Sequence, residues 1–435
     1  MISIGAVVGA GLFVGSSASI LSAGPATFIS YGLTGLLIMV VMRMLSEMMA
    51  ALPQVRTFPE FARAGLGDWA GFVAGWLYWY VWVLTVPIEA IAGARLLQAW
   101  IPLSQLQLGL LLMAAMTAVN LLSARSFAEF EFWFASIKVA AILVFIALTS
   151  AYAFGWSAPH GSTFSNLVDH GGFTPNGWIS VLAVVPSAFF AMGGAEITTI
   201  AAAESAQSGV TVAKLSTTVI WRILIFYVVT LFLVVAVTPW TAVRAGESPF
   251  TLALRAIGVP WADTIMSVII LTAVLSCMNS AFYVSSRVLF ILAARADAPA
   301  ALVRLNARRV PAGSVLTAAA AGVLGVLAAT QAPAAVFSFL ISSTGALMIF
   351  VYLLIVAAQV SLRRGRERRG EPQPAVTVWL VPWLSYAAFA GMIAVLVAMG
   401  AMQGLRQDLK FSCLTLAGVV IAYGFVRGSS TVRRR

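Results

Sequence analysis

The sequence has very few charged residues for a chain of 435. Asp, Glu, Lys and Arg together make up 9% of it, and hydrophobic residues make up 61%. Soluble domains carry about 25% charged residues, so this chain cannot cover itself with a water-compatible surface. A soluble enzyme, a secreted scaffold and a DNA-binding domain are therefore excluded. The composition predicts a protein embedded in a lipid bilayer.

Residues that build metal sites, disulfides and catalytic clusters are also scarce. The chain has two cysteines, Cys277 and Cys413, and two histidines, His160 and His170. It contains neither a CxxC pair for a metal nor a GxxxxGK[ST] loop for ATP. We therefore expect no metal, no cofactor, no enzyme activity and no ATP hydrolysis. A channel is disfavoured because no repeated pore signature or charge ring is present.

Apolar runs long enough to cross a bilayer recur along the whole chain. Helices are expected, because open strands leave backbone groups unsatisfied in lipid. The predicted spans are 3–22, 26–51, 70–99, 105–122, 130–154, 178–205, 213–238, 261–293, 314–331, 334–361, 379–402 and 410–427. A mixed segment, 248–257, is expected to form an interfacial helix. The fold class is an all-α polytopic membrane protein with about twelve transmembrane helices in a single domain, 1–435.

Positive charge lies mainly on one side of this arrangement. Most of the 26 lysines and arginines fall there, including a run from Arg363 to Arg369 that is expected to touch anionic lipid rather than nucleic acid. Five fall on the other side: Arg95, Arg244, Arg255, Arg406 and Lys410. The positive-inside rule makes the crowded side cytoplasmic, with both termini there. No signal-peptide pattern precedes the first span, which is expected to stay in the mature chain.

Two spans carry glycine clusters in mid-membrane. The first reads GAVVGAGLF from Gly5, and the sixth reads FFAMGGAE from Phe189. Glycine weakens a helix by about 1 kcal/mol relative to alanine, so each cluster indicates an unwound turn or close helix packing. These spans open two halves of opposite orientation, 1–154 and 178–361, which are followed by extra helices at 379–427. Matched interruptions in inverted halves favour a transporter site at the midplane.

An unwound helix exposes backbone groups that suit a small zwitterion. Amide N–H groups at the start of a half-helix hold a carboxylate, and freed carbonyls accept hydrogen bonds from an ammonium. Sugars or nucleosides would need more side-chain amides and carboxylates than these segments offer. The predicted site consists of Gly9, Ala10, Gly11, Phe190, Gly193 and Gly194. Phe190 is expected to roof or gate it.

Specific motifs recur along the chain, namely VVGAGLFVGSS, MRMLSEM, AEFEFWFASIKV, GAEITTIAAAES and MNSAFYVSSR. These segments resemble the amino acid transporter family of the amino acid–polyamine–organocation (APC) superfamily, and the likeness covers about residues 1–427. Within that family, GGFTPNG, VIWRILIFY and VFSFLISSTGALMIFVYL are most similar to the bacterial γ-aminobutyrate (GABA) permeases.

The resemblance implies a LeuT-like fold with two inverted five-helix repeats and a proton-coupled symport cycle by alternating access. It implies that the substrate carboxylate binds Val8 to Gly11, and that the amine binds carbonyls near Val7, Phe190 and Gly193. The expected function is proton-driven uptake of γ-aminobutyrate across the bacterial inner membrane. Another small or aromatic amino acid and a non-transporting amino acid sensor stay open as alternatives, and the oligomeric state is unknown.

Lys138 is the one cation predicted inside a span. It lies roughly eight residues, or about 12 Å, inside the fifth span. A charged lysine at the centre of a membrane helix costs about 2.5–3.5 kcal/mol, so it needs a partner or must lose its proton. We favour a proton switch over a permanently paired lysine. The resemblance places the ammonium where sodium-coupled relatives hold Na⁺, bracing the fifth span against the first and eighth.

Several other polar side chains within the spans have two interpretations each. Glu196 either relays a proton or braces the unwound turn through nearby backbone and hydroxyl groups. Glu89 either attracts the substrate amine or pairs with Arg95. Asn279 either faces the transport pathway or joins helices. Three glutamates are expected near cytoplasmic helix ends, where water reaches them, with interfacial or gate-pairing roles: Glu47, Glu131 and Glu204.

Overall fold

The computed structural model describes residues 7–55, 57–122, 124–156, 164–194, 196–197, 209–330 and 332–432. Within these ranges all regular secondary structure is helical, which fits a chain that must satisfy its backbone hydrogen bonds inside lipid. The long helices are α4 (Thr27–Ala51), α6 (Asp68–Leu97), α7 (Gln105–Leu122), α8 (Ala124–Ala153), α9 (Trp178–Met192), α11 (Gly209–Val237), α13 (Ala262–Ala294), α14 (Ala312–Ala328), α15 (Pro333–Arg368), α16 (Trp383–Ala401) and α17 (Gln403–Val432). The prediction of an all-helical membrane protein is confirmed.

Among the described residues, eight helical segments are long and apolar enough to cross a membrane. They are Ala10–Ala51, Asp68–Leu97, Gln105–Leu122, Glu131–Ala153, Ala262–Ala294, Ala335–Arg368, Trp383–Ala401 and Gln403–Arg427. Shorter apolar helices cover Trp178–Met192, Trp221–Val237 and Ala312–Ala328. Each predicted span overlaps one of these segments within the described residues, and Ala10–Ala51 overlaps the first two. The number of helices that actually cross the bilayer stays a prediction.

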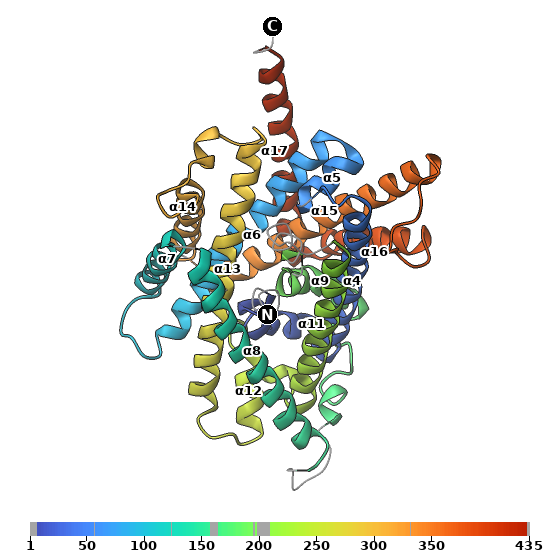
Figure 1. Cartoon of the computed structure of the whole chain (residues 1–435). Coiled ribbons are helices and arrows are strands. Elements are labelled where there is room, and N and C mark those ends of the chain that lie inside the picture. The colour runs from blue at the N-terminus through green and yellow to red at the C-terminus, as the bar shows by residue number, and fades with distance from the viewer. Residues whose placement is uncertain are drawn as a thin grey trace.

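Two of the short helices lie near the ends of the bundle. A helix expected over 248–257 is present as α12 (Pro249–Ala256), and its position at the membrane interface stays a prediction. A second short helix, α5 (Phe58–Leu66), has no counterpart among the predictions. It has a proline in its first turn, where a missing N–H costs nothing, and it ends at Gly67, whose φ of +93° favours glycine. Figure 1 shows α5 and α12 at opposite ends of the helix bundle.

Helices that are far apart in the sequence pack against each other. The most extensive contacts in the described structure join α4 to α11 and α6 to α13. In addition, α15 packs on both α6 and α9. At Gly345 the α15 backbone comes so close to the carbonyl of Pro186 in α9 that any Cβ would collide with it. These contacts surround the glycine-rich segments with α6, α9, α13 and α15.

Candidate functional site

Both predicted helix breaks are present. The short helix α2 (Ala10–Phe13) begins only after Gly9, whose backbone is extended with φ −142° and ψ −152°. In the other half, α9 ends at Met192, and Gly193 is extended with φ −62° and ψ 151°. Gly194 follows with a φ of +112°, a conformation that side-chain-bearing residues rarely adopt. The interpretation of the glycine clusters as unwound turns is therefore confirmed.

The two breaks face each other across a small pocket. Five predicted site residues line it: Val7, Gly11, Phe190, Gly193 and Gly194. The other walls come mainly from α6, α9, α13 and α15. The cavity volume is about 20 Å³, which holds roughly one water molecule and is too small for an amino acid. The pocket is therefore closed in this conformation and must widen before it takes a substrate.

Gly11 allows the two broken helices to touch beside the pocket. A Cβ at this position would lie 2.8 Å from Cα of Ala191 and 3.1 Å from Cε1 of Phe190. Phe190 is half-buried, and its ring lies against Gly11 at the edge of the pocket. This position fits the predicted role of Phe190 as a roof or gate.

A carboxylate of the protein itself occupies the predicted carboxylate cradle. The Ala10 N–H donates to Oε2 of Glu89 at 3.1 Å and to Oε1 at 3.2 Å. A Cβ on Gly9 would lie 2.6 Å from the same Oε1, so this approach requires glycine. The Cys277 thiol is hydrogen-bonded to the same carboxylate, and Val8, beside Gly9, is buried.

Neither sequence interpretation of Glu89 described this contact. The Glu89 side chain is buried against the first break. Arg95 is exposed nearly two turns farther along α6 and lines a different cavity. The expected pairing of these two residues is therefore replaced by a bond from Glu89 to backbone. Sequence reasoning missed it because the path of an unwound turn is not set by helical spacing.

Glu196 braces the second break. Its carboxylate accepts hydrogen bonds from the Gly194 N–H at 3.2 Å, from the Tyr352 hydroxyl at 3.0 Å and from the Tyr78 hydroxyl at 3.3 Å. All three side chains are fully buried. This geometry matches the bracing interpretation of Glu196. The two tyrosines were not predicted, although a buried tyrosine hydroxyl usually requires a partner.

Tyr227 of α11 joins the two breaks and is a second residue that sequence reasoning missed. Its hydroxyl lies 2.5 Å from the carbonyl oxygen of Ala191 and 3.1 Å from that of Val7. The Val7 carbonyl, predicted as an acceptor for a substrate amine, is thus already close to one donor. A carbonyl oxygen has two lone pairs, so it retains capacity for a second hydrogen bond.

Lys138 is buried in a polar chain that links α8 to α13. Its Nζ donates to Ser276 Oγ at 2.8 Å, and this hydroxyl lies 2.8 Å from Oε1 of Glu131. The predicted brace between the fifth and eighth spans is confirmed by this contact. The predicted contact with the first span falls partly on residues 1–6, which are outside the described ranges.

The prediction that water reaches three glutamates is wrong for two of them. Glu131 is fully buried because it belongs to the Lys138 chain. Glu47 is buried because it accepts hydrogen bonds from the Val378 N–H at 2.6 Å, Gln359 Nε2 at 3.1 Å and Arg363 Nη1 at 3.2 Å. Glu204 lies outside the described residues.

Asn279 is buried in α13 and makes a contact between helices. Its Oδ1 accepts a hydrogen bond from Nδ2 of Asn120 in α7 at 2.9 Å. The described residues that line the pocket do not include Asn279. The geometry therefore matches the helix-joining interpretation rather than a place in the pathway.

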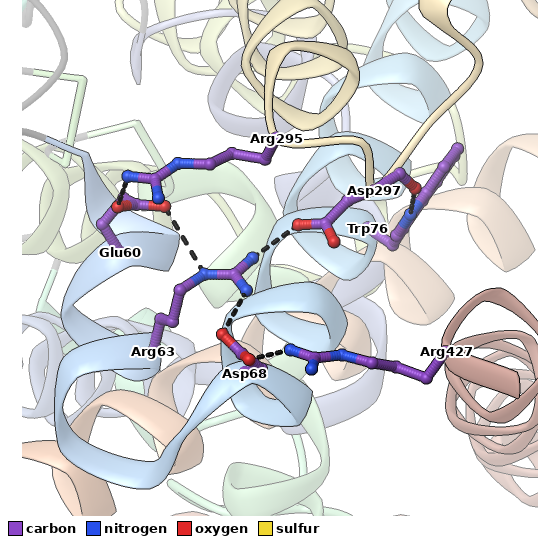
Figure 2. Close-up of polar contacts among 7 residues, drawn as sticks. All are labelled: Glu60, Arg63, Asp68, Trp76, Arg295, Asp297 and Arg427. Carbon is purple, nitrogen blue, oxygen red and sulfur yellow. Dashed lines mark hydrogen bonds and ion pairs between the residues drawn. The ribbon is translucent and has the colours of Figure 1, made fainter. Parts of the chain in front are cut away.

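A separate cluster of ion pairs lies at the α5 end of the bundle (Figure 2). Arg63 donates to Asp297 at 2.5 Å and to Asp68 at 2.9 Å, and its Nε is 3.6 Å from Glu60. Two further pairs extend the cluster: Arg295 with Glu60, and Arg427 with Asp68. The cluster ties α5 to the start of α6, the segment after α13 and the end of α17.

Comparison with known proteins agrees with the geometry. Residues 1–429 match the family described as amino acid permease. The chain is 43% identical to the γ-aminobutyric acid permease of Escherichia coli strain K12 over 425 residues, covering 97% of this chain and 91% of the relative. It is 41% identical to the γ-aminobutyric acid permease of Bacillus subtilis strain 168 over 427 residues, with the same coverage. An aromatic amino acid transport protein of Corynebacterium glutamicum is 34% identical over 440 residues, covering 100% of this chain and 94% of the relative.

The protein is thus a multi-pass membrane transporter, not an enzyme. The chain belongs to the amino acid permease family, and its substrates are amino acids.

Proposed function

We propose that the protein takes up γ-aminobutyrate together with protons, by alternating access around the two broken helices. The observation that carries this proposal is the pair of unwound turns facing one pocket, where backbone N–H and carbonyl groups suit a zwitterion. The choice of substrate is supported by the relatives named γ-aminobutyric acid permeases, at 41% and 43% identity.

The proposed architecture has twelve transmembrane helices, with inverted repeats over 1–154 and 178–361 and two extra helices at 379–427. The candidate spans and the shorter apolar helices together reach this number when Ala10–Ala51 is divided at its short turn, Gly24–Ala26. The packing of α4 on α11 and of α6 on α13 supports the repeats, since these helices correspond to the second and third predicted spans of each half. The positive-inside rule supports cytoplasmic termini in a bacterial inner membrane.

Proton coupling is proposed to work through competition for the first break. A substrate carboxylate needs the Ala10 N–H, which the Glu89 carboxylate now holds. Protonation of Glu89 would weaken it as an acceptor, because ionised acceptors make the stronger hydrogen bonds. The freed N–H could then bind the substrate. In this scheme Lys138 is the second proton-dependent group, Glu196 holds the second break, and the proton gradient is the only driving force.

The amine of the substrate is proposed to bind carbonyls at the breaks. γ-Aminobutyrate carries its amine farther from its carboxylate than an α-amino acid does, so its amine must reach a more distant acceptor. Val7 beside one break and Phe190 beside the other both line the pocket and offer carbonyls. The pocket must widen before it can bind either γ-aminobutyrate or an α-amino acid.

Uptake of labelled γ-aminobutyrate into proteoliposomes tests the proposal directly. An inward proton gradient should drive accumulation, and unlabelled γ-aminobutyrate should compete better than alanine, proline, lysine or phenylalanine. If any α-amino acid competes more strongly than unlabelled γ-aminobutyrate, the assignment of γ-aminobutyrate as the substrate is wrong. Binding without flux would identify a sensor, and accumulation that ignores the proton gradient would overturn the coupling.

A further inference from the structure

A second and much larger cavity lies toward the α12 end of the bundle, the end opposite α5 in Figure 1. Its volume is about 580 Å³. We call it the vestibule. Its walls come from the end of α6, the connection between α11 and α12, α12 itself and the start of α13. The charged residues that line it are Arg95, Arg244, Glu247, Arg255 and Asp263.

The vestibule and the central pocket are stacked along the same three elements. On the first span, Gly11 lines the pocket and Val14, about one turn farther, lines the vestibule. On α6, Glu89 lines the pocket and Arg95 the vestibule. On α13, Cys277 and Ile270 take these two positions, about two turns apart. A ligand in the vestibule therefore lies directly on the route to the pocket.

A buried aromatic contact lies beside the wall of the vestibule, at the residue between Pro249 and Thr251. Phe250 of α12 packs edge-on against Phe13 of α2 with ring centroids 5.1 Å apart, and it also packs against Phe145 of α8 at 4.8 Å. Phe250 itself is fully buried. Phe250 therefore joins α12, which forms a wall of the vestibule, to α2, whose Gly11 lines the central pocket.

The arginines of the vestibule differ in how their charge is balanced. Arg255 forms a bidentate pair with Asp263, with Nε 2.8 Å from Oδ2. Arg95 and Arg244 are exposed, and neither makes an ion pair among the described residues. The Arg95 guanidinium packs against Gly246, which has a φ of +76° and leaves the room that a side chain would fill. The Gly246 N–H in turn donates to Ser17 Oγ at 2.9 Å, which fixes this connection to the first span.

We propose that the vestibule is a carboxylate-binding site, in which Arg95 and Arg244 hold the carboxylate of the incoming amino acid before the central pocket opens. Arginine presents a fork of N–H donors that matches a carboxylate, and two arginines in one cleft attract the negative end of a zwitterion. Glu247 on the same wall faces the ammonium of the ligand. This inference rests on the proposed function, because it assigns a step to the same substrate.

The test compares initial uptake of labelled γ-aminobutyrate by wild-type protein and by the double variant Arg95→Gln/Arg244→Gln in proteoliposomes. At low ionic strength kcat/KM should fall about tenfold in the double variant, within the range of electrostatic steering, while kcat stays close to that of the wild type. At about 1 M salt, where the Debye length is about 3 Å, the two proteins should converge. Arg95→Lys/Arg244→Lys should recover only part of the loss, because lysine keeps the charge but not the fork of N–H donors.

The control is Arg406→Gln, which makes the same kind of substitution, with the loss of one positive charge, at an exposed residue outside the vestibule. Arg406 is expected on the same side of the membrane, and its Nε donates to the Gly400 carbonyl at 3.0 Å. An unchanged kcat/KM in the double variant, or an equal loss in Arg406→Gln, overturns the vestibular site and leaves the proposed function intact. Failure of the wild-type protein to carry any amino acid overturns both.

Discussion

Charged residues are balanced in opposite ways in the central site and in the cluster around Arg63. In the central site, Glu89 and Glu196 accept hydrogen bonds from backbone N–H groups, and Glu196 also from tyrosine hydroxyls. In the Arg63 cluster, carboxylates face guanidinium groups (Figure 2). A carboxylate bonded to neutral donors gives them up to a ligand, or when it takes up a proton, more readily than a carboxylate that is paired with a guanidinium group, because charge-assisted hydrogen bonds are stronger. The comparison separates a region built to change from a region built to hold.

Gly11→Ala is expected to have the largest effect on the region built to change. Its Cβ would lie 2.8 Å from backbone Cα of Ala191, so the broken helices must separate at the pocket. A shift of this size at a binding site can cost about 100-fold in rate, and both uptake and exchange of γ-aminobutyrate should fall by that order. The control is Gly418→Ala, which meets nothing within 4 Å. Normal uptake by Gly11→Ala would show that transport does not require the close contact between Gly11 and Ala191.

Glu89→Gln should uncouple transport from protons without closing the pocket. The amide oxygen can still accept from the Ala10 N–H, but as a neutral and weaker acceptor. We expect exchange of labelled for unlabelled γ-aminobutyrate to persist and accumulation to lose its dependence on the proton gradient. Glu371→Gln, in an exposed segment, is the matched control. Retention of gradient-driven accumulation by Glu89→Gln would remove Glu89 from the coupling step.

Lys138→Ala should also reduce accumulation more than exchange, with a smaller margin. The variant removes the donor to Ser276 and leaves the buried Glu131 without the lysine charge, so part of its effect is loss of stability. Accumulation and exchange are measured in the same proteoliposomes, which separates coupling from the amount of folded protein. An equal loss of both would assign Lys138 a structural role.

The fold was largely predictable because membrane helices are long and uniformly apolar. The segment 105–122 was predicted with the bounds that α7 has, and Gly9 and Gly193 marked both breaks. The short helix α5 was missed because its nine residues mix polar and apolar positions inside a predicted loop. Amphipathic spacing between Phe58 and Leu66 was the signal available.

The site was only half predictable, for a physical reason. The positions of the two helix breaks could be predicted, because glycine clusters mark them in the sequence. Their partners come from helices far away in the chain: Glu89 lies 79 residues from Ala10, and Tyr227 lies 220 residues from Val7. Such contacts depend on helix rotation, which sequence spacing alone does not set. The burial of Glu131 was missed for the same reason, since Ser276 is 145 residues away.

Arg63→Gln tests the region built to hold. The variant leaves the partly buried Asp297 and Glu60 with fewer donors, and unsatisfied buried polar groups cost about 1–3 kcal/mol. The thermal midpoint in detergent should fall, while the KM for γ-aminobutyrate stays close to that of the wild type, since the described residues lining the pocket do not include Arg63. A large change in KM with an unchanged midpoint would show that the cluster takes part in the transport cycle.

Arg427→Gln should have the smallest effect and sharpens the same comparison. Arg427 and Asp68 are about half exposed, at 52% and 46%, and exposed ion pairs contribute about 0–1 kcal/mol because water and salt screen them. The midpoint of Arg427→Gln should lie within a degree or two of the wild type, and the difference should vanish at high salt. A fall as large as that of Arg63→Gln would mean that the end of α17, rather than Arg63, holds this end of the bundle together.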